Sequence, residues 1–270
     1  MTAKKNSQDS SVLAVSRKEK VILSASHDIV ESDPGWDDRY YNHAILSQVG
    51  LPRSKTSESN FMRKNGSAWI NIQSGFIDTG NGPVMQPIPY GSMPRLILAW
   101  LATFAIKHKT QEINVGKSRG EFLKLMGQDG QGNRYSTLDV QMPALAAARL
   151  QFGYSGRTYN GQPVQQFDAW SSNPDNGMDS KWPGVLILSD EYYTSLKNGA
   201  VPLDRRALFA LKGSSLRIDI YAWLANRLCR IEGRQYLLPW KPLREQFGQE
   251  YKGKNPDKDF SREFIAALND

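Results

Sequence analysis

One stretch of this chain occurs twice, and the repeat constrains the fold more than any other feature of the sequence. The first copy spans residues 91–129 (GSMPRLILAWLATFAIKHKTQEINVGKSRGEFLKLMGQD). Its Ala-Trp-Leu-Ala at residues 99–102 returns 123 residues later, and its Met-Gly-Gln-Asp at residues 126–129 returns 121 residues later as Phe-Gly-Gln-Glu. A two-residue difference in the connecting turn reconciles the offsets. A chain of 270 residues with one such repeat has room for two domains.

Each copy has the pattern of a helix, a short strand, a second helix and, after a polar loop, a third helix. Residues 94–109 are apolar on nearly every face, which predicts a buried helix with Ser92 as its cap. Residues 112–115 predict a short strand, and Ser118 with Glu121 forms a capping box for the second helix. Followed by a hairpin, this is the order of a winged helix, a helix-turn-helix variant that presents its third helix to DNA.

The two expected third helices differ in character. In the first copy this helix covers residues 136–151 and is mainly aliphatic, which suits packing or dimerisation more than contact with base edges. The extended runs after it, residues 150–155 and 163–170, predict a wing-like hairpin. In the second copy we expect the third helix to begin near Ser261 and to present Ser261, Arg262 and Asn269 outward.

We therefore predict an α+β chain with two tandem winged-helix domains. Residues 1–36 are assigned to a mobile N-terminal tail, because the first part of this segment is polar and charged. Residues 37–200 form the first domain, with a role in dimerisation and DNA backbone contacts, and residues 201–270 form the second. We also expect a helix over residues 37–49 and a strand over residues 236–240.

Positive charge collects in the repeated units. The chain carries a net charge of +7, and residues 94–127 contain six basic and two acidic side chains. Residues 227–262 contain nine basic and five acidic side chains, which leaves the remainder close to neutral. Two basic clusters in helix-rich units are expected if both face a polyanion such as DNA.

The candidate DNA-binding residues are the basic and polar side chains of these units. We expect Arg262 to read a base, because a residue near the start of a recognition helix reaches the groove edge. The remaining candidates contact DNA alongside it or grip its backbone: Ser261, Asn269, Lys241, Arg244, Lys254, Lys258, Arg234, Lys117, Arg119, Lys124, Arg149 and Arg157.

Enzymatic functions find no support in the sequence. Residues 115–118 (Val-Gly-Lys-Ser) match half of a phosphate-binding loop, but Gln111 stands where its first glycine belongs. The three histidines lack the spacing of a metal-dependent nickase, so we expect no cofactor and no metal. Cys229 lies in a helical pattern and is expected in the core. The N-terminus resembles no signal peptide and no run could span a bilayer, so we expect a cytoplasmic protein of a bacterium.

Two separated groups of residues are shared, in order, with a known family: PYGSMPR at residues 89–95, and then Pro202-Leu203-Asp204, Arg206-Ala207-Leu208, Ala210-Leu211-Lys212, Asp219, Tyr221, Trp223 and Leu224. From about residue 40 onward the chain resembles the RepA family of bacterial plasmid replication initiators. The resemblance implies binding to repeated sites (iterons) in double-stranded DNA at a plasmid origin. It also implies duplex opening, recruitment of the host initiator and helicase, and repression of its own promoter as a homodimer, which links it to copy control.

Two questions stay open at this point. A plasmid-encoded transcriptional repressor would use the same DNA-binding parts and recruit no helicase, so composition does not separate it from an initiator. The sequence also stops at Asp270, inside the last expected helix, where the family would continue into a second wing.

Overall fold

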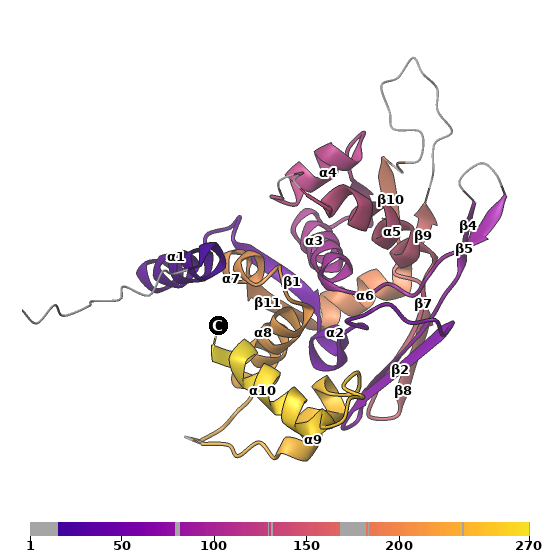
Figure 1. The fold of residues 1–270 in the computed structure, drawn as a ribbon. Helices are drawn as coiled ribbons and strands as arrows, with labels where there is room; N and C mark the ends of the chain where they lie inside the picture. Colours follow the sequence, from indigo (N-terminus) through magenta and orange to yellow (C-terminus); the bar gives the residue numbers. More distant parts are fainter. Residues whose placement is uncertain are drawn as a thin grey trace, which may run out of the picture.

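The computed structural model describes residues 16–78, 82–128, 130, 132–167, 182, 184–233 and 235–269. Helices and strands occur largely in separate runs along the chain, in keeping with the predicted α+β class (Figure 1). The described helices are α1 (Arg17–Glu31), α2 (Ala44–Val49), α3 (Ser92–His108), α4 (Arg119–Leu125), α5 (Arg134–Ala147), α6 (Asp190–Gly199), α7 (Arg205–Ala210), α8 (Ser215–Leu228), α9 (Trp240–Phe247) and α10 (Pro256–Asn269). The described strands are β1 (Arg39–His43), β2 (Asn60–Asn65), β3 (Ala68–Gln73), β4 (Phe76–Asp78), β5 (Pro83–Met85), β6 (Glu112–Asn114), β7 (Arg149–Tyr154), β8 (Arg157–Gly161), β9 (Val164–Phe167), β10 (Val185–Leu188) and β11 (Ala200–Asp204).

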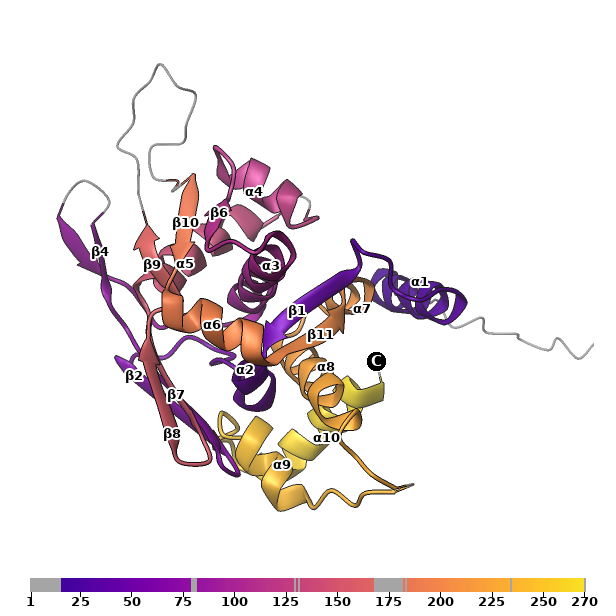
Figure 2. The same ribbon diagram turned by 180° about the vertical axis from the view of Figure 1, so that it is seen from behind.

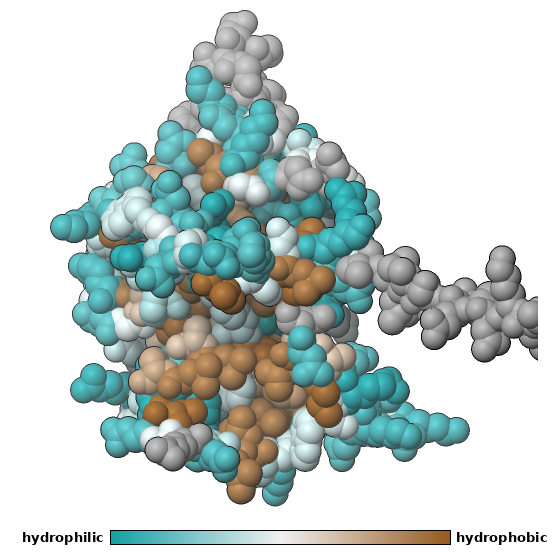
Figure 3. Space-filling model, turned by 90° about the vertical axis from the view of Figure 1, so that its left-hand side faces the viewer, coloured by the Kyte–Doolittle hydropathy of each residue, from teal (hydrophilic) through white to brown (hydrophobic). Residues whose placement is uncertain are grey.

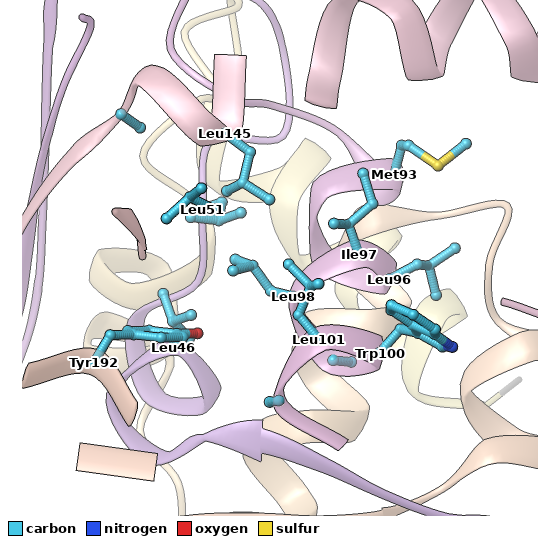
Figure 4. Close-up of a cluster of buried hydrophobic side chains, with 14 of the residues drawn as sticks. Leu46, Leu51, Met93, Leu96, Ile97, Leu98, Trp100, Leu101, Leu145 and Tyr192 are labelled. Atoms are coloured by element: carbon cyan, nitrogen blue, oxygen red, sulfur yellow. The ribbon is translucent and has the colours of Figure 1, made fainter. Parts of the chain in front are cut away.

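Helix α3 lies at the centre of the molecule, with β1, α5, α6 and α8 packed around it (Figures 1 and 2). Its side chains are buried on several faces, as its apolar sequence predicted. Figure 4 shows its leucines and Trp100 in one cluster with Leu46, Leu145 and Tyr192 from other helices. The helix begins two residues before the expected Pro94, so Ser92 is its first residue. The capping position belongs to Gly91, whose φ of 82° suits glycine.

Two antiparallel sheets cover this core from one side. Strands β2, β3, β7 and β8 pair in that order, and Ala68, Ile70 and Ile72 of β3 are fully buried, which confirms the strand predicted there. A hairpin forms here from β7 and β8 around a turn at Ser155 and Gly156, so the arm that pairs with β7 is residues 157–161 and not the expected residues 163–170. Its expected second arm lies elsewhere, because β9 pairs with β10 in a separate sheet of order β6-β10-β9.

Residues 37–49, expected as one helix, divide into strand β1 and helix α2. Strand β1 pairs antiparallel with β11, so that Tyr40 lies opposite Leu203. The helical spacing of the apolar residues was misleading here, because the strand depends on a partner about 160 residues away in sequence. The pairing also fastens an early segment of the chain to the segment that follows α6.

His43 closes strand β1 and caps α2 as a neutral, buried side chain. Its Nδ1 accepts a hydrogen bond from the backbone N–H of Ile45 at 3.2 Å, and its Nε2 lies 3.0 Å from the hydroxyl of Ser195. Ser195 donates its own proton to the carbonyl of Tyr192 at 2.7 Å, so the imidazole proton resides on Nε2. Burial lowers the pKa of His43 to about 4.

Helix α1 lies within residues 1–36, which the sequence assigned to a mobile tail without a helix. A capping box begins it: the hydroxyl of Ser16 accepts from the N–H of Glu19, whose carboxylate accepts from the N–H of Ser16. At its other end Arg206 of α7 donates to the carbonyls of Asp28 and Ser32, at 2.8 and 2.9 Å. A local signal and a long-range contact together define this helix.

A second, smaller hydrophobic cluster lies between α8, α9 and α10. The other face of α8 contributes Ile218 and Ala222 to the larger core, so this helix joins the two clusters. Strand β11 and helix α7 also pack in the larger core, through Val201, Leu203 and Leu208. The smaller cluster consists of Leu216, Ile220, Trp223, Leu243, Phe247, Phe260 and Phe264.

Three details of residues 201–270, the second half of the fold, correct the sequence predictions; residues 37–200 are the first half. The described residues 235–239 form no strand, because no described strand lies beside them to pair with. Helix α10 begins at Pro256, earlier than the expected start near Ser261, and proline at the first position with acidic residues after it suits a helix N-terminus. Cys229 is exposed and not part of the core, because α8 ends one residue before it.

Candidate nucleic-acid interface

The two copies of the repeat fold into the same order of three helices. Helices α3, α4 and α5 follow one another in the first copy, and α8, α9 and α10 in the second. Trp100 and Trp223 are both buried, as their equivalent positions predicted. Each indole meets a phenylalanine of the next helix edge-on: Trp100 meets Phe122 at 5.2 Å, and Trp223 meets Phe247 at 5.5 Å between ring centroids. An edge-on aromatic contact therefore links the first two helices in both copies, although Phe122 corresponds in the repeat to Leu243 and not to Phe247.

Helix α10 turns its aromatic residues inward and its polar residues outward. Phe260 and Phe264 are buried against α8 and α9, one helical turn apart. Arg262 is 66% exposed and forms an ion pair with Asp259 at 3.1 Å, whereas Ser261 is half-buried. Because the helix begins at Pro256, both residues lie in its second turn, deeper than expected for the tip of a recognition helix.

Exposed apolar side chains leave only part of the second half suited to contact with DNA. Leu228, Leu237, Ile265 and Leu268 are all exposed. Figure 3 views the molecule from the side on which α1 and the end of α10 lie, and shows apolar surface gathered in its lower part. The polar positions that suit DNA therefore lie in the first half of α10, and exposed Asn269 lies at its far, more apolar end.

Three lysines of the second half are exposed at the surface, whereas Arg244 is engaged in contacts within the chain. Lys241, Lys254 and Lys258 are exposed near the start of α9 and α10. Arg244 donates to the carboxylate of Asp257 and to the carbonyl of Tyr251, each at 2.9 Å. Its guanidinium therefore ties the segment between α9 and α10 to α9. Arg234 lies outside the described residues.

The basic residues of the first half surround α4, at the opposite end of the molecule from α9 and α10 (Figures 1 and 2). Lys117 and Lys124 are exposed, whereas Arg119 is paired with Asp139 at 2.8 Å. The phosphate-loop fragment here is closed: the N–H of Gly116 donates to Asn114, and the N–H of Lys117 donates to Glu121, at 2.8 and 2.7 Å. These N–H groups are not available to a phosphate.

Arg149 and Arg157 both lie on the β7–β8 hairpin. Arg149, expected at the end of the third helix, is instead the first residue of β7, because α5 ends at Ala147. Arg157 is exposed beside the hairpin turn, which lies at the same end of the molecule as α9 (Figure 1). Strand β2 of the same sheet packs against α9. The first half thus brings a basic hairpin to the face that the second half forms.

The aliphatic face of α5 packs against other elements of the same chain. Leu138, Met142 and Leu145 are fully buried in the larger core, and the exposed part of the helix carries Tyr135 and Val140 with polar neighbours. The aliphatic character that suggested packing or dimerisation is therefore explained by packing within the chain. The exposed first half of α5 has little positive charge, in contrast to α10.

A buried ionic network, which the sequence did not reveal, joins the two halves. Arg95 of α3 forms a bidentate ion pair with Asp219 of α8, with nitrogen–oxygen distances of 2.6 and 2.7 Å. The same guanidinium donates to the backbone carbonyls of residues 51, 52 and 91. Gly50 makes room for the pair, because a Cβ there would lie 2.9 Å from the carboxylate of Asp219. Charge-assisted bonds of this kind hold α8 in one orientation against α3.

Glu250 is the second acidic member of this network, at the end of the repeated Phe-Gly-Gln-Glu. Its carboxylate accepts from the side chain of Arg53 at 2.8 Å and from Arg63 at 3.0 Å. Burial works to raise the pKa of Glu250, but the two guanidinium groups outweigh it, so the pKa is lowered. Burial lowers the pKa of Arg63 to about 10. The second half is thus tied to the first at two separate carboxylates.

Among the described residues, no group of three or more histidine, cysteine or acidic side chains could hold a metal ion. None of the described helices has the length and apolar character needed to cross a membrane.

Comparisons with known proteins show a family from the sequence and a similar fold from solved structures. The sequence model of the family described as "plasmid encoded RepA protein" matches residues 88–241, which is more than half of the chain. Among curated proteins, no sequence match was found. The fold is similar to a crystal structure of selenomethionine derivatives of domains 2 and 3 of RctB, with a TM-score of 0.53 and 12% identity over 84% of each chain. A second structure of RctB domains 2-3 gives a TM-score of 0.52 and 14% identity over 84% of this chain and 82% of that chain.

Proposed function

This chain belongs to the family of plasmid-encoded RepA proteins, and we propose that it initiates plasmid replication by binding repeated sites in origin DNA. In this proposal each repeated unit is a winged helix. The second unit reads sequence, and the first adds contacts to the DNA backbone. The protein then helps to open the duplex and recruits host replication proteins. The family resemblance alone supports these last two steps and a homodimeric state.

The single observation that carries the proposal is the outer surface of α10. It is the third helix of a three-helix unit, and its inner face is fixed by Phe260 and Phe264. Its first half leaves Lys258 and Arg262 exposed, with Lys241 and Lys254 on neighbouring segments. A helix with basic side chains at one end, anchored by a small aromatic core, suits insertion into the major groove.

The buried network supports the idea that both units act on one DNA molecule. Arg95 and Asp219 fix α8 against α3, and Glu250 fixes the segment after α9 against the first half. A preorganised pair of binding units loses less conformational freedom on binding than two loosely tethered ones. The hairpin with Arg157 then contacts the backbone beside the site that α10 reads.

Nuclease protection on the DNA upstream of the gene tests the proposal and separates it from its competitor. An initiator protects several direct repeats at regular spacing. A transcriptional repressor, the alternative function, protects one inverted repeat. Protection of a single inverted repeat alone would favour the repressor, and absence of any protected site would contradict both.

The variant Arg262→Ala tests the role of α10 on the same DNA. If Arg262 contacts a base, this variant loses about 1 to 3 kcal/mol of binding free energy on the specific site and far less on a scrambled duplex. Arg149→Ala is the comparison variant: Arg149 is also exposed but lies on β7, so its loss should change binding to the two duplexes similarly or to neither. An equal loss for Arg262→Ala on both duplexes would assign Arg262 to phosphate and base reading to another residue.

A further inference from the structure

A hollow of about 460 Å³ lies away from the α10 surface, between the start of β1, helix α3, the end of α4 and helix α7. Its size is within the range of small-molecule sites. None of the residues proposed above to contact DNA lines it. Its walls are mainly aromatic, with a few charged side chains at the rim. This combination differs from the apolar core beneath it and from the lysine-rich surface of α9 and α10.

The aromatic walls are held in place by contacts within the protein. Trp36 is 64% exposed, yet the ammonium of Lys107 donates to its carbonyl and lies 5.1 Å from the centre of its indole. On α3, the rings of Phe104 and His108 lie 4.3 Å apart, and Trp100 lies 5.5 Å from Phe104. An exposed indole fixed beside an ordered aromatic group offers a flat ligand a surface for stacking at low cost in entropy.

The polar groups of the hollow include the hydroxyl of Tyr40. Tyr40 is only 6% exposed and lines the hollow, and its hydroxyl makes no hydrogen bond within the described part of the chain. Burial raises the pKa of this phenol to about 12, so it is a donor at neutral pH. A hydroxyl that lines the hollow and has no partner among the described residues is available to donate to a group bound there.

Charged groups of both signs complete the lining. Lys107 and Arg205 are cationic, and Asp37 is anionic. Arg205 is oriented by Asp38, whose carboxylate accepts from it at 2.9 and 3.1 Å. Lys107 feels the charges of both aspartates and of Arg205 and Arg39. The site therefore offers donors and acceptors together, which is unsuited to a simple anion and suited to a flat group with both on its edge.

A nucleobase has these properties: two π faces for stacking and an edge of donors and acceptors. We propose that this hollow binds one unpaired nucleobase, stacked on Trp36 and hydrogen-bonded by Tyr40 and the charged rim. The base comes either from a free nucleotide or from a single DNA strand. The second source rests on the proposed initiator function, in which duplex opening exposes such bases. Stacking on aromatic side chains is the general means by which proteins hold unpaired bases.

The test uses the full chain, mononucleotides and a short oligothymidylate, with tryptophan fluorescence and the anisotropy of labelled oligonucleotide as readouts. Trp36→Ala should weaken binding by roughly fivefold or more, because stacking on an aromatic residue carries that much affinity per base. Tyr40→Phe removes only the hydroxyl and should weaken binding while leaving the fold intact. Phe76→Ala is the matched control, since Phe76 is 63% exposed and lies on β4, away from the hollow.

The outcomes separate the two sources and the two proposals. Binding of both ligands, weakened by Trp36→Ala, assigns the site to the base itself; binding of the oligonucleotide alone assigns it to a DNA strand. No binding of either ligand, or equal effects of Trp36→Ala and Phe76→Ala, would overturn the inference. Trp36→Ala should keep the protected sites on duplex DNA unchanged, so a failure of duplex binding in the unmodified chain would concern the initiator proposal only.

Discussion

Replacing Asp219 by asparagine tests the connection between the two halves of the chain. The change keeps the shape of the side chain and removes its charge, so Arg95 remains buried without its carboxylate. Breaking a buried ion pair from one side typically costs about 3 to 5 kcal/mol. Three backbone carbonyls still accept from Arg95. We therefore expect a loss near the lower end, about 3 kcal/mol, from a total stability of roughly 5 to 15 kcal/mol.

Urea-induced unfolding of the full chain, followed by tryptophan fluorescence, measures this loss. Asp257→Asn is the matched control, because it removes the same charge from an ion pair of similar length with Arg244. The carboxylate of Asp257 is 88% exposed, against 8% for that of Asp219. The control should cost less than about 1 kcal/mol. Equal and small losses in the two variants would show that the buried pair does not stabilise the junction.

Three further predictions concern pH, packing and charge. The pKa of His43 falls from 6.5 in the unfolded chain to about 4 in the folded one, so the free energy of unfolding should drop by roughly 3 kcal/mol as pH falls from 6.5 to 4. His43→Gln should flatten this dependence of stability on pH. Parallel curves for the variant and the unmodified chain would contradict the prediction. Trp100→Ala and Trp223→Ala should each cost about 3 to 5 kcal/mol in urea unfolding, and a small loss in either would contradict the equivalence of the two units. Lys241→Ala with Lys258→Ala should reduce the salt slope of DNA binding by roughly 2, and an unchanged slope would remove these lysines from the interface.

The sequence predicted the parts of the fold that depend on local signals. The apolar run of α3, the N-cap at Ser118 and the alternation in β3 all appear in the structure, although the carboxylate of Glu121 accepts from the N–H of Lys117 and so does not complete the predicted capping box. The start of α10 was also available, because Pro256 followed by acidic residues is a signal for a helix N-terminus, and it was overlooked in favour of the position of Ser261.

Features that depend on distant partners were beyond the reach of sequence patterns. Tyr40 and Tyr41 fit a helical period, yet they form a strand because β11 lies beside them. Residues 236–240 carry the aromatic and aliphatic side chains typical of a strand, but no described strand pairs with them. The ion pair of Arg95 joins residues 124 positions apart, and nothing in the local sequence of either indicates the other.

The initiator role of the chain is tested most directly by a replication assay. A plasmid that carries only this gene, its upstream DNA and a selectable marker is introduced into a bacterial host that cannot replicate the marker fragment alone. We expect stable plasmid maintenance with the intact gene, and loss of the plasmid when a stop codon interrupts the reading frame and the protein is not supplied in trans. Maintenance that does not depend on the protein, or failure to replicate while the upstream promoter is still repressed, would contradict the initiator role and favour the repressor.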